Sequence, residues 1–128
     1  MTDKFKRILI IDDDIDDQMI ILSAIKLIGP AYECEFASNG TEAIEYAEQS
    51  MPYDIVLIDL NMPLMNGFDT LRILRSIKLY DDVPLVIIST SNNNYDMDRA
   101  KQLGANRYII KPDTFPGLVN ELKLALEL

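Results

Sequence analysis

The segment RILIIDDD, residues 7–14, is a continuous apolar run that ends abruptly in three acids. Runs rich in β-branched residues are typical of strands buried on both faces, as in parallel sheets. Similar runs cover residues 55–58 and 85–88, and a shorter one covers residues 108–110. Residues 32–36 alternate instead, which is typical of an edge strand. We therefore expect a five-stranded parallel sheet.

Helix-like segments separate these runs. In the first, residues 15–28, Ile15, Met19, Leu22 and Ile25 have the spacing of one helical face, which we expect to pack on the sheet. The other helices are predicted to start after Asn39 with Glu42 as its capping-box partner, at Gly67, at Asn94 before a stop at Gly104, and at Phe115, where Leu118, Leu122 and Ala125 share a face. The order (βα)5 predicts an α/β fold with a doubly wound parallel sheet.

The composition fits one domain over residues 1–128, with no linker or repeat. The net charge of −9 argues against DNA binding, and the absence of histidine excludes histidine metal sites and catalytic triads. No apolar run is long enough to span a membrane. Cys34 is the single cysteine and cannot form an internal disulfide, so a cytoplasmic location is expected. Cys34 itself is interpreted as a buried apolar residue.

Polar side chains follow the predicted strands at the point where each one ends. Asp12 and Asp13 follow the first, Asp59 the third, Ser89 the fourth and Lys111 the fifth. Ligands of open parallel sheets bind at this carboxyl edge. Converging carboxylates repel one another unless a cation lies among them, and Mg²⁺ prefers oxygen ligands. The pattern therefore predicts a Mg²⁺ site, in which Mn²⁺ could substitute.

The same residues fit phosphoryl transfer. The carboxylate of Asp59 is the expected nucleophile and needs no base, because it is already ionised. Lys111 and the Ser89 hydroxyl are the expected contacts for other phosphoryl oxygens.

Four motifs in order carry a family resemblance: ILIIDD at residues 8–13, DIVLIDLNMP at 54–63 followed by Asn66-Gly67, PLVIIST at 84–90, and YIIKP at 108–112 after Gly104-Ala105. With them the chain resembles the receiver domains of two-component response regulators, including the single-domain chemotaxis type. The resemblance covers essentially the whole chain. It implies a flavodoxin-like sheet with strand order 2-1-3-4-5.

The resemblance also implies roles residue by residue. Asp59 is the implied phosphorylation site; Asp12, Asp13, Asp59 and the backbone carbonyl of Asn61 are the implied metal ligands. Lys111 and Ser89 would stabilise the phosphoryl group, and Ser89 and Tyr108 would form a conformational switch. Pro112 would follow a cis peptide bond.

The implied function is that of a phosphoacceptor rather than an enzyme. A histidine kinase or a histidine phosphotransfer protein would donate the phosphoryl group, and an unidentified downstream protein would receive the signal. No output domain is expected, and the chain would be a monomer or a phosphorylation-dependent dimer.

Two alternatives remain open. In a haloacid-dehalogenase-like Mg²⁺ phosphatase, Asp12 would be the nucleophile and Asp14 the acid and base. In a scaffold, binding would ignore phosphorylation. A flavodoxin-like cofactor binder is excluded, because the acids at residues 12–14 would repel a phosphate. Asp14, Asp16 and Asp17 are interpreted as acids favoured by a helix N-terminus rather than as further ligands.

Overall fold

The structure, a computed structural model, describes residues 6–49, 51–62 and 65–127; Pro63 of the third-strand motif lies outside these ranges. Strands and helices alternate as predicted. The strands are β1 (Lys6–Ile11), β2 (Tyr32–Ala37), β3 (Ile55–Asp59), β4 (Leu85–Ser89) and β5 (Arg107–Ile110). The helices are α1 (Ile15–Ile28), α2 (Gly40–Gln49), α3 (Gly67–Ser76), α4 (Asn94–Gln102) and α5 (Phe115–Leu126), with a 3₁₀ turn, η1 (Lys78–Tyr80), that the sequence did not predict.

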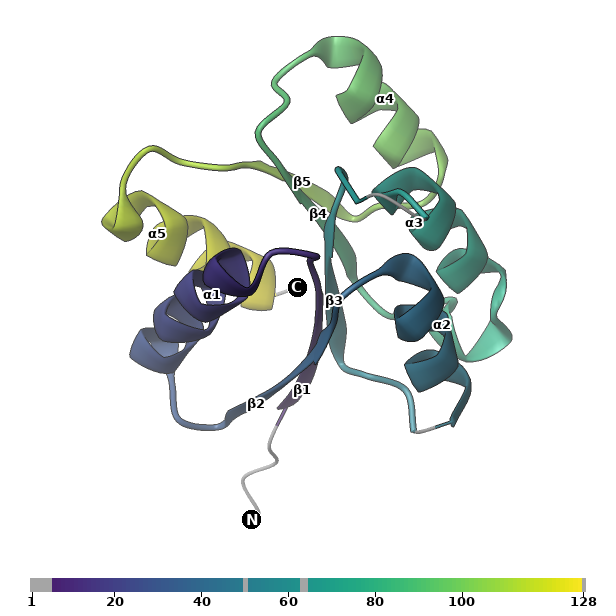
Figure 1. Ribbon diagram of the computed structural model, residues 1–128, viewed down its shortest axis with the longest axis horizontal. Helices are drawn as coiled ribbons and strands as arrows, with labels where there is room; N and C mark the ends of the chain where they lie inside the picture. Colours follow the sequence, from purple (N-terminus) through teal and green to yellow (C-terminus); the bar gives the residue numbers. More distant parts are fainter. Residues whose placement is uncertain (1–5, 50, 63–64, 128) are drawn as a thin grey trace.

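The five strands form one parallel sheet in the order β2-β1-β3-β4-β5, which confirms the predicted fold class. Helices α1 and α5 cover one face of the sheet, and α2, α3 and α4 cover the other (Figure 1). Every residue of β3 and β4 is buried, as the continuous apolar runs predicted. Each fully buried aliphatic side chain contributes about 1.5–3 kcal/mol, so the central strands form a stable platform.

The face of α1 that packs on the sheet agrees with the predicted one at Ile25 but not throughout. Ile21, Ala24 and Ile25 are buried, whereas Ile15 is 69% exposed and Met19 is 45% exposed. The prediction was wrong for Ile15 and Met19. Two sets of apolar residues on this helix have helical spacing, and spacing alone does not select between them. The buried face of α5 is the predicted one.

Polar contacts at the helix ends follow the sequence signals closely. The backbone N–H of Glu42 donates to Asn39 Oδ1 at 2.8 Å. Glu42 Oε1 in turn accepts from the N–H of Ser38, whereas in a standard capping box it would accept from the N–H of the N-cap residue, Asn39. Gly104 has a φ of +107°, and its N–H donates to the carbonyl of Lys101. Glycine therefore ends α4 as predicted.

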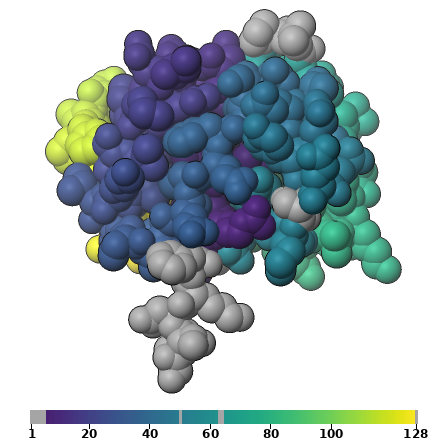
Figure 2. Space-filling model, turned by 60° about the horizontal axis from the view of Figure 1, so that its bottom comes forward, coloured from purple at the N-terminus to yellow at the C-terminus, as the bar shows by residue number. Residues whose placement is uncertain are grey.

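In the space-filling view, the segment of β2 lies in the middle, with α1 on one side of it and α2 on the other, and α5 is visible only at one edge (Figure 2). Within the described ranges, no helix is both long enough and apolar enough to cross a membrane.

Gly67 brings the start of α3 against the end of β3. Its N–H donates to the carbonyl of Leu60 at 2.9 Å. A Cβ at this position would lie 2.5 Å from the carbonyl oxygen of Asp59 and 2.6 Å from Leu60 Cα. Both are backbone atoms that a rotamer change cannot move. Glycine is therefore required for α3 to approach the strand that carries Asp59.

We expect Gly67→Ala to lower the free energy of unfolding by about 1–3 kcal/mol, the usual cost of overpacking. Chemical denaturation measures it. Gly29→Ala is the matched control, because its Cβ would meet only the Tyr32 side chain, at 3.3 Å. Equal losses in the two variants would contradict the assigned close approach.

Candidate functional site

The carboxyl ends of β1 and β3 bring three acids together. Asp12 follows β1, Asp59 ends β3, and the two strands are neighbours in the sheet. Carboxylate oxygens of Asp12, Asp13 and Asp59 lie within 4.8 Å of one another. Asp12 and Asp59 are buried and Asp13 is exposed. The three predicted acids therefore do converge, in a geometry that fits a divalent cation with oxygen ligands.

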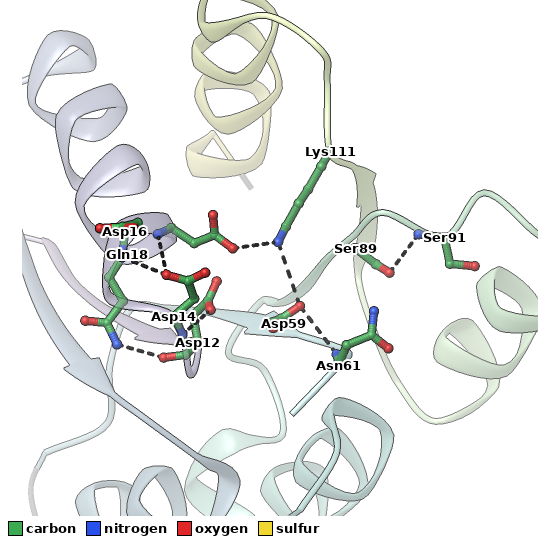
Figure 3. Close-up of polar contacts among 10 residues, drawn as sticks. Asp12, Asp14, Asp16, Gln18, Asp59, Asn61, Ser89, Ser91 and Lys111 are labelled. Atoms are coloured by element: carbon green, nitrogen blue, oxygen red, sulfur yellow. Dashed lines mark hydrogen bonds and ion pairs between the residues drawn. The ribbon is translucent and has the colours of Figure 1, made fainter. Parts of the chain in front are cut away.

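Backbone and side-chain hydrogen bonds fix Asp12 in place. Its Oδ1 accepts from the N–H of Asp14 at 2.9 Å, and its carbonyl accepts from Gln18 Nε2 at 2.7 Å (Figure 3). Gln18 is buried, and the sequence analysis did not single it out. The available signal was a lone amide among the apolar positions of α1. Gln18 joins α1 to the end of β1 and so orients the acid pair.

Asp14 is the N-cap of α1. Its carboxylate accepts from the N–H groups of Asp16, at 2.8 Å, and Asp17, at 3.4 Å. The interpretation of Asp14 as a helix N-terminal acid is confirmed. The phosphatase alternative needs the same carboxylate as acid and base, so capping leaves that alternative without support.

Lys111 reaches from the end of β5 toward Asp59 (Figure 3). Its Nζ lies 4.0 Å from Asp59 Oδ1 and 3.3 Å from Asp17 Oδ2. Proximity to Asp59 was predicted, and the closer partner Asp17 was not. Asn61 lies on the other side of Asp59, where its N–H donates to Asp59 Oδ1 at 3.4 Å. A ligand role for the Asn61 carbonyl stays a prediction.

The peptide bond between Lys111 and Pro112 is trans, because none of the described peptide bonds is cis. The expectation of a cis bond before Pro112 was therefore wrong. The trans form is the more stable isomer of a proline bond. The backbone N–H of Lys111 donates to the carbonyl of Ser89 at 2.7 Å, which aligns the end of β5 with the end of β4. That bond places the lysine without a cis turn.

Burial and charge shift the pKa values of the central groups in different directions. Burial raises the pKa of Asp12 to about 6, and the neighbouring charge of Asp59 adds to the rise. The pKa of Asp59 is also raised, chiefly by burial, although Lys111 opposes the shift. Burial lowers the pKa of Lys111, but Asp59, Asp17 and Asp12 outweigh it and the net shift is upward. Lys111 is therefore a cation beside two acids whose ionised forms are disfavoured by burial.

Ser89 and Tyr108 are both hydrogen-bonded to Ser91. The fully buried Ser89 Oγ accepts from the N–H of Ser91 at 3.0 Å. The Tyr108 hydroxyl donates to the carbonyl of Ser91, also at 3.0 Å. Ser91 Oγ donates to Asp96 in the first turn of α4. Ser91 therefore connects both predicted switch residues to α4, a role that the sequence analysis missed.

We expect the raised pKa of Asp12 to make stability depend on pH in the metal-free protein. Burial favours the neutral form of Asp12 in the folded state. Its contribution to the free energy of unfolding is therefore fully present below the unfolded-state pKa of 3.8 and is lost as pH rises through the folded-state pKa of about 6. Asp12→Asn should therefore stabilise the protein at pH 8, by at most about 3 kcal/mol. The gain should be smaller at pH 5 by about 1–2 kcal/mol. Urea denaturation with EDTA measures it, and a gain independent of pH would contradict the assignment.

Comparisons with known proteins agree with this geometry. The model of the "Response regulator receiver domain" family matches residues 8–123. The chain is 30% identical to chemotaxis protein CheY1 of Helicobacter pylori, covering 94% of this chain and 96% of that protein. It is 31% identical to transcriptional regulatory protein PrrA of Mycobacterium leprae, covering 94% of this chain but only 49% of PrrA.

A solved structure, that of the phosphorylated cyanobacterial phytochrome response regulator RcpA, superposes with a TM-score of 0.86. It is 27% identical and covers 95% of this chain and 91% of that one. The family match over residues 8–123, the strand order and the converging acids agree with one another. This chain belongs to the response-regulator receiver domain family.

Proposed function

We propose that Asp59 accepts a phosphoryl group from the phosphohistidine of a histidine kinase or a histidine phosphotransfer protein. The observation that carries the proposal is the convergence of Asp12, Asp13 and Asp59 within 4.8 Å, with the Lys111 ammonium 4.0 Å from Asp59. The similar response regulator RcpA has been solved in a phosphorylated form, which supports the same chemistry here.

In the proposed transfer, a carboxylate oxygen of Asp59 attacks phosphorus, and the bond from phosphorus to the histidine nitrogen breaks. The electron pair returns to the imidazole, and an aspartyl phosphate forms. The Asp59 carboxylate needs no base, because it is the deprotonated nucleophile. Lys111 would neutralise charge on the phosphoryl oxygens.

Asp12, Asp13, Asp59 and the Asn61 carbonyl are the proposed ligands of Mg²⁺, for which Mn²⁺ could substitute. The bound ion would neutralise phosphoryl charge during transfer. Oxygen donors fit this hard cation. The raised pKa values of Asp12 and Asp59 fit the same proposal, since a cation among these acids would favour their ionised forms.

The proposed output is a two-state equilibrium biased by phosphorylation. A phosphoryl group adds roughly −1.5 to −2 charge beside Ser89 and gives its hydroxyl a new acceptor. The Ser89 oxygen now accepts from the N–H of Ser91, and Tyr108 is bonded to the carbonyl of the same residue. A shift of Ser89 would therefore alter the hydrogen bonds of Ser91 to Tyr108 and to α4. The downstream partner is proposed to be a protein in the cytoplasm, and dimerisation on phosphorylation stays a prediction.

The first test is phosphorylation by acetyl phosphate, followed by intact-mass spectrometry. We expect the wild-type chain to gain one phosphoryl mass with Mg²⁺, and no gain with EDTA or in Asp59→Asn. No gain in the wild-type chain, with partner binding intact, would favour a scaffold. Continuous phosphate release that survives Asp59→Asn and is lost in Asp12→Asn would favour a phosphatase.

The second test separates phosphoryl acceptance from switching. We expect Ser89→Ala to remain phosphorylated at Asp59 while the phosphorylation-induced NMR shifts of the Ser91 and Tyr108 amides shrink. Ser76→Ala is the matched control, because the Ser76 hydroxyl donates only within its own helix, to the carbonyl of Ile73. Undiminished amide shifts in Ser89→Ala would contradict the switch assignment.

A further inference from the structure

Lys111 lies between two carboxylates from different elements and is closer to the one outside the acid cluster. Its Nζ is 3.3 Å from Asp17 Oδ2, where it forms a hydrogen bond. It is 4.0 Å from Asp59 Oδ1, which is beyond hydrogen-bond range. The ammonium is therefore hydrogen-bonded to Asp17 and forms only a longer ion pair with Asp59.

The surroundings favour this pair. Asp17 and Lys111 line one cavity between α1 and α5, together with the apolar side chains of Ile21, Ile88 and Leu118. The side chains of Lys111 and Asp17 are 25% and 39% exposed. Apolar neighbours weaken solvent screening of an ion pair. The pair also ties the first turn of α1 to the end of β5.

Asp17 is not free to follow the ammonium toward Asp59. Its backbone belongs to the first turn of α1, which Asp14 caps. Lysine, in contrast, carries a point charge on a flexible stem. We therefore expect an approach of the ammonium to a group on Asp59 to lengthen its contact with Asp17.

We propose that Asp17 is a positioning residue that holds Lys111 back from Asp59 until a phosphoryl group draws the ammonium across. The inference rests on the proposed phosphoacceptor function. A phosphoryl group carries roughly −1.5 to −2 charge and outcompetes a single carboxylate. Movement of the ammonium to the phosphoryl group would also break the ion pair between α1 and the end of β5. Phosphorylation would thereby change the contacts of α1.

The test measures the dissociation constant of beryllofluoride, a phosphoryl mimic, at saturating Mg²⁺. Asp17→Asn removes the competing charge and should tighten binding by about two- to fivefold, the range set by a partly exposed ion pair. Asp16→Asn is the matched control: it removes the same charge from the same helical turn, and Asp16 is exposed, with no contact to Lys111 among those found in the described residues. It should leave the constant within experimental error of wild type.

A double-mutant cycle separates positioning from through-space charge. In a Lys111→Met background, binding should be weaker and Asp17→Asn should have no further effect. A second measurement follows the ¹³Cε resonance of Lys111, which reports the surroundings of the ammonium. Asp17→Asn alone should move this resonance toward its beryllofluoride-bound position.

Unchanged or weaker beryllofluoride binding in Asp17→Asn would overturn the inference. So would an effect that persists in Lys111→Met, because it would then act without the lysine. Failure of the proposed function looks different: wild-type protein would gain no phosphoryl mass from acetyl phosphate. The two failures are therefore distinguishable.

Discussion

The crowding of like charge at the carboxyl edge of the sheet constrains everything around it. Asp12 and Asp59 are buried side by side, and burial raises the pKa of both. Such acids are costly to ionise unless positive charge compensates them. Lys111 supplies part of that charge, and the three-carboxylate geometry leaves a place for a divalent cation. A divalent cation with oxygen ligands would balance the remaining negative charge of these acids.

The central strands β3 and β4 and the loop between β4 and α4 differ in how firmly they are held. Strands β3 and β4 are buried throughout, so their ends keep Asp59 and Ser89 at fixed positions. In the segment after β4, the N–H of Ser91 donates to Ser89 Oγ, the carbonyl of Ser91 accepts from the Tyr108 hydroxyl, and Ser91 Oγ donates to Asp96. Individual hydrogen bonds contribute only about 0.5–1.5 kcal/mol net, which one added phosphoryl contact can offset. In the proposed switch, the loop before α4 is therefore the part that a new charge would rearrange without disturbing the sheet.

Hydrophobic pattern predicted the strands, the helix order and the buried face of α5, because these depend on local periodicity. The same reasoning correctly chose Ile25 on α1 but also chose Ile15 and Met19, although Ile21 has helical spacing with Ile25 too and only sheet packing decides between the two faces. The isomer of the bond before Pro112 was also beyond local pattern. The structure has the trans isomer there, which is the more stable form of a proline bond.

The sequence by itself determined that acids, a hydroxyl and a lysine end neighbouring strands, because the side chain at a strand end is fixed by position along the chain. It thereby determined the acid cluster and the approach of Lys111 to Asp59. Only the tertiary structure decided that Lys111 pairs more closely with Asp17, a residue 94 positions away, and that Gln18 and Ser91 connect the site to α1 and α4. These contacts depend on how α1 packs beside α5 and how the β4–α4 loop folds back. Distances between such remote segments are set by packing and not by the local pattern of either segment.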